Sequence, residues 1–257
     1  MEAKLLQMDL VWGKPAENRR RAEALLRAEA GADLYVLPEM FSTGFATEPE
    51  GIAEKGSDGS CETLDWLWQM SQELDAALTG SVAVCEDGRY FNRCYFVRPD
   101  WKMYVYDKHH LYTYGAENEY FTAGDTAVVA KWKGWRFRLA VCYDIRFPVW
   151  LRNRGDYDAL ICVANWPDVR RTAWDTLLRA RAIENQCYVL GVNRIGKDPS
   201  CKYDGGTVVI NPFGDVLAEA ENGREEVVSG ELDFAMLRSY VDKFPVLKDA
   251  DKFELKQ

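Results

Sequence analysis

The chain has 257 residues, of which 47% are hydrophobic and 28% are charged, and its net charge is -9. This composition supplies enough apolar material for a packed core, which excludes global disorder, and the length fits a single α/β domain over residues 1–257. The negative charge and the dispersed Lys and Arg residues disfavour nucleic acid and membrane surfaces as partners.

The first elements alternate between strand and helix patterns. Residues 4–12 alternate like a strand, and residues 15–30 contain helix formers with apolar side chains on one face. A short apolar strand follows at 34–37 and is stopped by Pro38. We therefore expect Glu39 to lie just beyond the carboxyl end of a buried strand.

The second set of elements leads to a lysine. Residues 61–78 have apolar side chains at helical spacing, and a turn is expected at 87–88. Strand patterns follow at 80–85, 90–97 and 103–106. The last of these strands delivers Lys108 at its end.

The remaining elements begin with a loop at 113–125 and a strand at 136–141, which ends at Cys142. Further strands are predicted at 159–164, 188–193, 207–210 and 216–221, with a helix at 172–186. No internal repeat, linker or low-complexity segment interrupts this pattern. The sequence predicts one layered α/β domain.

Three ionisable residues thus follow predicted strands, where α/β sheets gather their ligand-binding groups. A polar residue at a strand end is ordinary, so each of Glu39, Lys108 and Cys142 taken singly has a structural explanation. Together they contain a nucleophile, a base and a cation: an ammonium favours a thiolate, and a carboxylate accepts the proton of the thiol. The set predicts nucleophilic catalysis without histidine.

Other chemistries have weaker support. The only histidines are the adjacent His109 and His110, whose side chains diverge on a strand, so packing or hydrogen bonding explains them better than a metal site does. We expect no metal and no organic cofactor. The seven cysteines form no CxxC pair, and the N-terminus has no secretion signal, which together predict a cytoplasmic protein.

Three segments carry a family resemblance: 37–41 (LPEMF), 107–111 (DKHHL) and 142–148 (CYDIRFP). In order and separation they resemble the signature segments of the nitrilase superfamily, the carbon-nitrogen hydrolases. Downstream segments similar to those of the family occur at 164–167 (ANWP), 180–186 (ARAIENQ) and 191–194 (GVNR). The resemblance therefore covers nearly the whole chain.

The resemblance implies a four-layer αββα sandwich, usually dimeric, with helices outside two packed sheets. It also implies that Glu39 is the general base, that Cys142 is the nucleophile, and that Lys108 and the backbone N–H of Tyr143 stabilise the oxyanion. The family places a second glutamate before a Phe-Thr-x-Gly segment. Glu117 fits that position, and Glu119 fits it less well.

The substrate-binding candidates are Arg146, Trp166 and Arg170. Either arginine could bind a substrate carboxylate, although Arg146 could equally orient its loop through an internal salt bridge. Trp166 could line the pocket or anchor the core. Segments 142–147 and 164–174 resemble the omega-amidase branch, which deamidates short 2-oxo dicarboxylic acid monoamides such as 2-oxoglutaramate and 2-oxosuccinamate.

Three function hypotheses remain at this stage. The first is hydrolysis of a small linear amide, with ammonia released through a thioester. The second uses the same three residues on N-carbamoyl compounds or nitriles. The third is an interaction protein with an inactive site, because a fold does not guarantee chemistry. A thiol redox role lacks a resolving cysteine at short spacing.

Overall fold

The computed structural model describes residues 1–56 and 61–255, and its centre is a pair of β-sheets. The first sheet has the spatial order β15 (Glu226–Glu231), β1 (Glu2–Gln7), β2 (Leu34–Val36), β4 (Ala77–Glu86), β5 (Arg89–Val97) and β6 (Met103–Asp107), with β3 (Glu54–Lys55) paired to β4. The second sheet has the order β14 (Val216–Glu219), β13 (Val208–Ile210), β10 (Tyr188–Asn193), β9 (Ala159–Ala164), β8 (Trp135–Val141) and β7 (Val129–Trp132). A hairpin of β11 (Ile195–Lys197) and β12 (Lys202–Asp204) lies beside them.

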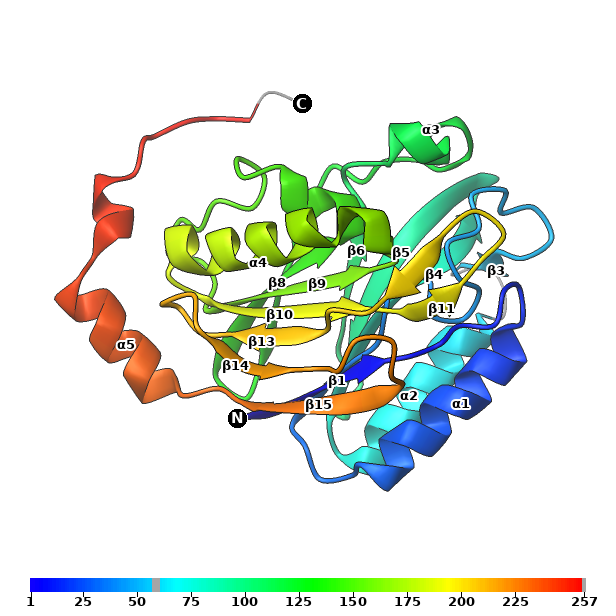
Figure 1. The fold of residues 1–257 in the computed structure, drawn as a ribbon, viewed down its shortest axis with the longest axis horizontal. Coiled ribbons are helices and arrows are strands. Elements are labelled where there is room, and N and C mark those ends of the chain that lie inside the picture. Colours follow the sequence, from blue (N-terminus) through cyan, green and yellow to red (C-terminus); the bar gives the residue numbers. More distant parts are fainter. Residues whose placement is uncertain (57–60, 256–257) are drawn as a thin grey trace.

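Helices cover the outer faces of both sheets (Figure 1). On the first sheet α1 (Pro15–Ala28) and α2 (Glu62–Leu74) lie side by side, and α4 (Arg171–Asn185) packs on the second sheet. α5 (Phe234–Lys243) follows β15 near the C-terminus. The predicted αββα sandwich is confirmed.

Alternation along the strands explains why both faces of the first sheet are apolar. In β1, Leu5 packs toward the second sheet, whereas Leu6 belongs to the cluster under α1 and α2. Between the sheets the rings of Phe96 and Phe137 stack with centroids 5.8 Å apart. Since successive side chains of a strand point to opposite faces, each strand of this sheet contributes to two apolar layers.

Strand direction brings the functional edge together. β1, β2 and β4 run parallel, and so do β8, β9 and β10, so their carboxyl ends lie on the same side of each sheet. β6 has the direction of β4 because β5 is antiparallel to both. The turn between β4 and β5 consists of Asp87 and Gly88, both with positive φ (50° and 71°), as a two-residue hairpin of this twist requires.

Two predicted boundaries were wrong. The helix predicted at 61–78 ends at Leu74, where Asp75 adopts a left-handed conformation, and β4 starts at Ala77 rather than at residue 80. The region predicted as a loop at 113–125 contains a 3-10 turn (Thr113–Gly115) and the short helix α3 (Glu117–Tyr120).

Within the described residues, no helix is long and apolar enough to cross a membrane.

Candidate active site

A buried cluster of charged side chains lies where the two sheets meet. Glu39 follows β2, Lys108 follows β6 directly, and Glu117 begins α3; all three side chains are fully buried. The ammonium Nζ of Lys108 lies 2.9 Å from Oε1 of Glu39 and 2.8 Å from Oε2 of Glu117. Glu119 is exposed, so Glu117 is the glutamate that accompanies Lys108.

Cys142 lies on a sharp turn directly after β8. Its φ of 46° is unusual for a residue with a side chain, and the 3-10 turn Cys142–Arg146 begins there. Asp144, which is fully buried, fixes this turn: its Oδ2 accepts hydrogen bonds from Val141 N (3.0 Å) and Tyr106 Oη (2.6 Å). Positive φ costs free energy, so the turn persists because its surroundings hold it.

The protonation state of Cys142 depends on burial and on its two charged neighbours. Burial raises the pKa of the Cys142 thiol well above its usual range, and the negative charge of Glu39 raises it further. Lys108 lowers the pKa of this thiol but does not outweigh them. The balance of these effects favours a neutral thiol in the free site, which gives its proton to a base when it reacts.

Lys108 and Glu117 perturb each other strongly. Burial on its own would lower the pKa of Lys108, but the carboxylates of Glu117 and Glu39 hold it well above its usual range, so the side chain is a permanent cation. Burial raises the pKa of Glu117, against the opposing effect of Lys108. The cluster thus combines one fixed positive charge with two carboxyl groups.

Two asparagines complete the surroundings of Glu39. The backbone N–H of Asn165 donates to Oε2 of Glu39 (2.8 Å), and its side-chain Nδ2 donates to the Glu39 carbonyl (2.6 Å). Asn92, on β5, donates to Oε1 of both Glu39 (2.8 Å) and Glu117 (3.1 Å). The sequence analysis assigned no role to either, and Asn92 does not stand out within β5, where Arg93 follows it directly.

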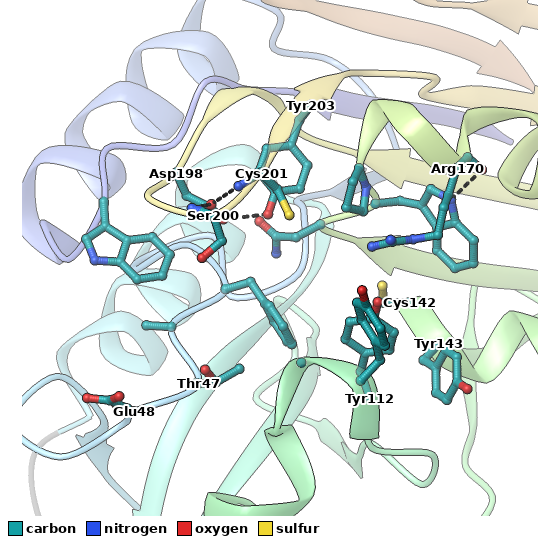
Figure 2. A pocket seen from close by; sticks show the side chains of 18 of the residues that line it. Thr47, Glu48, Tyr112, Cys142, Tyr143, Arg170, Asp198, Ser200, Cys201 and Tyr203 are labelled. Atoms are coloured by element: carbon teal, nitrogen blue, oxygen red, sulfur yellow. Dashed lines mark hydrogen bonds between the residues drawn. The ribbon is translucent and has the colours of Figure 1, made fainter.

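A cavity of about 650 Å³ opens above Cys142 (Figure 2). Tyr143, Arg146, Trp166 and Arg170 all line it, so the structure gathers every predicted pocket residue around the thiol. Trp166 is also largely buried, with its indole N–H donating to the Arg170 carbonyl at 2.8 Å. The Trp166 side chain therefore packs in the hydrophobic core and also lines the cavity.

The two pocket arginines contact aromatic rings. The guanidinium of Arg146 lies 4.7 Å from the ring centroid of Trp166, and that of Arg170 lies 5.5 Å from the centroid of Tyr112. Neither forms an ion pair with any described residue, so the alternative of an internal salt bridge for Arg146 finds no partner among them. Within the described part of the chain both cations thus line the cavity without a carboxylate partner.

The two histidines support the turn that carries Cys142. Nδ1 of His110 lies 2.9 Å from Oδ1 of Asp144, and its ring stacks on Phe147 at 3.7 Å. The ring of His109 stacks on Trp150 at 3.7 Å. In the described ranges no group of three His, Cys, Asp or Glu side chains could hold a metal ion.

Comparisons with known proteins match this geometry. A carbon-nitrogen hydrolase family model matches residues 3–242. The omega-amidase YafV of Escherichia coli (strain K12) is 43% identical over 252 residues, covering 98% of this chain and 97% of that protein. A 2-oxoglutaramate amidase of Bacillus subtilis (strain 168) is 34% identical over 253 residues, covering 96% of each.

A solved structure extends the similarity to three dimensions. A CN-hydrolase superfamily protein of Xanthomonas campestris, which has an arsenic adduct in its active site, superposes with a TM-score of 0.95 at 41% identity. The match covers 100% of this chain and 99% of that chain. The similarity therefore includes both sheets and the strand ends that carry the cluster.

Proposed function

This chain belongs to the carbon-nitrogen hydrolase family, and on that premise we propose that it is an omega-amidase. Such an enzyme hydrolyses the terminal amide of a 2-oxo dicarboxylic acid monoamide, here 2-oxoglutaramate or 2-oxosuccinamate, to ammonia and the 2-oxo dicarboxylate. Full-length relatives named omega-amidase and 2-oxoglutaramate amidase support this substrate class.

The observation that carries the proposal is the composition of the cavity. Its floor presents the Cys142 thiol, backed by the buried Glu39–Lys108–Glu117 cluster, and its wall presents two arginines without carboxylate partners among the described residues. A substrate carboxylate entering a protein of net charge -9 needs such a local cation. An uncharged amide substrate would not need a cation in the cavity.

In the proposed mechanism Glu39 takes the thiol proton as the sulfur of Cys142 attacks the amide carbon. The C=O bond becomes an oxyanion, which Lys108 and the backbone N–H of Tyr143 stabilise. The C–N bond then breaks, and the nitrogen leaves as ammonia with the proton held by Glu39. Water, deprotonated by Glu39, hydrolyses the thioester and regenerates the thiol.

Glu117 has a supporting role in this proposal. It accepts two contacts from Lys108 Nζ (2.8 and 3.1 Å) and one from the Tyr112 backbone N–H (2.7 Å). An ammonium has three N–H groups, and here they make three contacts, one with Glu39 and two with Glu117, so an oxyanion takes over one of these contacts as it forms. Glu117 thereby orients the cation, while Glu39 is free to exchange a proton.

We further propose that residues 1–257 form a single domain that acts in the cytoplasm as a homodimer. The seven cysteines are free thiols, as a reducing compartment maintains them. Exposed aromatic residues near α5 supply apolar surface for a second copy: Phe213 and Phe244 flank Tyr240, and the Phe213 and Tyr240 rings are 4.2 Å apart. Light scattering on the purified protein tests the dimer.

The decisive experiment is ammonia release from a substrate panel. We expect kcat/KM for 2-oxoglutaramate and 2-oxosuccinamate to exceed that for N-carbamoyl amino acids, nitriles and uncharged amides. Equal or better hydrolysis of N-carbamoyl compounds or nitriles would reject the omega-amidase proposal, while the roles proposed for Glu39, Lys108 and Cys142 would be unaffected. Absence of ammonia from every compound would favour the interaction-protein hypothesis.

A further inference from the structure

A chain of hydrogen bonds connects the backbone beside Glu39 to both carboxylates of the cluster. The backbone N–H of Met40 donates to Ser81 Oγ (2.9 Å), and Ser81 Oγ donates to Asn92 Oδ1 (2.8 Å). Nδ2 of Asn92 then donates to Oε1 of Glu39 and of Glu117. Ser81 and Asn92 are fully buried on the adjacent strands β4 and β5, so solvent does not compete for these bonds.

The hydrogen-bond partners at both ends of this chain agree on the orientation of the Asn92 amide. A backbone N–H can only donate, so Ser81 Oγ accepts from Met40, and its own hydrogen is donated to Asn92 Oδ1. With Oδ1 bound to Ser81, the NH₂ group of Asn92 faces the two glutamates. A turned amide would place Oδ1 against the carboxylates and take the acceptor away from the Ser81 hydroxyl.

This orientation selects the ionised form of Glu39. Its Oε1 receives hydrogen bonds from Asn92 and Lys108, and its Oε2 receives one from the backbone N–H of Asn165 and a longer one from Nδ2 of the same residue. All of these partners are donors, and donors stabilise a carboxylate relative to a carboxylic acid. Glu39 is thus held as an acceptor while it waits for the thiol proton.

We propose that Ser81 and Asn92 form a positioning relay that keeps Glu39 ionised and oriented toward its catalytic task. The proposal rests on the base role of Glu39 given above. Neither residue touches the substrate or Cys142 in this scheme; both act through Glu39 and, by the second bond of Asn92, through Glu117. The single NH₂ group also fixes the spacing of the two carboxylates around Lys108.

Four titratable groups face Glu39 from the elements packed around it. They are Lys108 after β6, Glu117 of α3, Cys142 after β8 and, further away, Cys162 of β9. Burial raises the pKa of Cys162 well above its usual range, so that thiol stays neutral. Changes in the relay therefore act on a background in which Lys108 is the fixed positive charge beside Glu39.

The test is the pH dependence of kcat/KM in Asn92→Ala and Ser81→Ala. Without the Asn92 donor the ionised form of Glu39 loses a hydrogen bond, so the acidic limb of the kcat/KM profile should move to higher pH by about one unit. kcat at neutral pH should fall roughly tenfold or more while KM changes little. Ser81→Ala should shift the limb in the same direction by a smaller amount, because the amide becomes free to turn.

Thr79→Val is the matched control. Thr79 is buried on the same strand as Ser81, and its hydroxyl contacts Cys94 Sγ at 3.5 Å, outside the relay. This variant removes a buried hydroxyl and should leave the acidic limb in place. Thermal unfolding of each variant identifies temperatures at which all are folded.

A second readout does not require the proposed substrate. Infrared titration of the protonated carboxyl band, assigned to Glu39 by its loss in Glu39→Gln, should give a higher pKa in Asn92→Ala than in the wild type. An unchanged infrared pKa together with an unchanged limb in folded Asn92→Ala would overturn the relay. Failure of the wild type to hydrolyse any amide would instead refute the proposed function, and the infrared result would still decide the relay.

Discussion

Asp144→Asn should weaken both the fold and the reaction, because Asp144 holds the turn that carries Cys142. Its two oxygens accept from Val141 N, Tyr106 Oη, His110 N and, at 2.9 Å, His110 Nδ1. Asparagine has the same shape but replaces one acceptor oxygen by a donor. The substitution therefore probes hydrogen bonding with little change in packing.

The size of the effect follows from what surrounds each oxygen. Tyr106 Oη already accepts from Trp150 Nε1 (3.1 Å), so its hydrogen points to Oδ2 of Asp144. An NH₂ group at the Oδ2 position takes the acceptor from both Val141 N–H and the Tyr106 hydroxyl, whereas an NH₂ group at the Oδ1 position takes it from His110 N–H and is the less costly arrangement. One buried unsatisfied donor costs about 1 to 3 kcal/mol, and loss of charge assistance brings the total to about 2 to 4 kcal/mol.

A change of that size lowers Tm by about 2 to 4 °C per kcal/mol in a chain of this length and leaves the protein folded at 25 °C. The turn at Cys142 should relax from its positive φ, and kcat should fall at least tenfold. Burial favours the protonated form of Asp144, but hydrogen bonds from His110 and Tyr106 hold its pKa below the usual range. Its charge therefore contributes stability above the unfolded pKa, which is lost as pH falls through the folded value.

Asp158→Asn provides the comparison. Asp158 is buried and accepts from Arg136 and Arg238, and it precedes Ala159 at the end of β9 opposite to Asn165. This variant should lose stability to a similar degree and keep its kcat. If Asp144→Asn also retained wild-type kcat at a temperature where both variants are folded, the turn would not need Asp144 for catalysis.

Three further predictions concern the reaction itself. Cys142→Ala should lose turnover and keep the far-UV spectrum and Tm, since it removes the acyl acceptor alone; measurable ammonia release would refute the nucleophile assignment. Iodoacetamide should alkylate Cys142 more slowly in Glu39→Gln than in the wild type, with Cys85 as internal reference in peptide mapping, because a neutral thiol needs the base. Arg146→Met or Arg170→Met should raise KM for 2-oxoglutaramate about tenfold or more and leave uncharged amides nearly unaffected; equal effects on both classes would remove the carboxylate role.

Several elements could be predicted because local pattern and tertiary context agree. The strands Ala159–Ala164 and Tyr188–Asn193 match their predicted bounds, since fully buried parallel strands are continuous apolar runs. The end of α2 could not be placed, because Ala76–Leu78 continues the helical spacing of apolar residues. Only the left-handed conformation of Asp75 separates helix from strand.

The C-terminal strand and helix were not predicted. β15 (Glu226–Glu231) has only two buried residues, and its identity as a strand comes from pairing with β1 across the sheet. The four-residue α3 is too short for periodicity to detect. Its consequence is functional, because α3 carries Glu117 into the cluster.

The convergence of Glu39, Lys108 and Cys142 was predictable, because residues at the carboxyl ends of strands share an edge. The net effect of the neighbouring charges on the Cys142 thiol was not predictable. From the sequence Lys108 is the neighbour that matters most for this thiol, whereas in the structure Lys108 already pairs with two carboxylates. The pKa of a buried group depends on which charged side chains contact it in the folded chain, and the spacing of residues along the sequence does not give these contacts.

A neutral resting thiol is what the proposed chemistry requires. The leaving nitrogen must gain a proton to depart as ammonia, and in the proposed sequence the proton that Glu39 delivers is the one that Cys142 gave up. A site that rested as thiolate and carboxylate would begin attack without that proton. Burial and the charge of Glu39 raise the pKa of the Cys142 thiol, so the thiol keeps the proton that Glu39 later delivers to the leaving nitrogen. The positive charge of Lys108 then serves to stabilise the oxyanion.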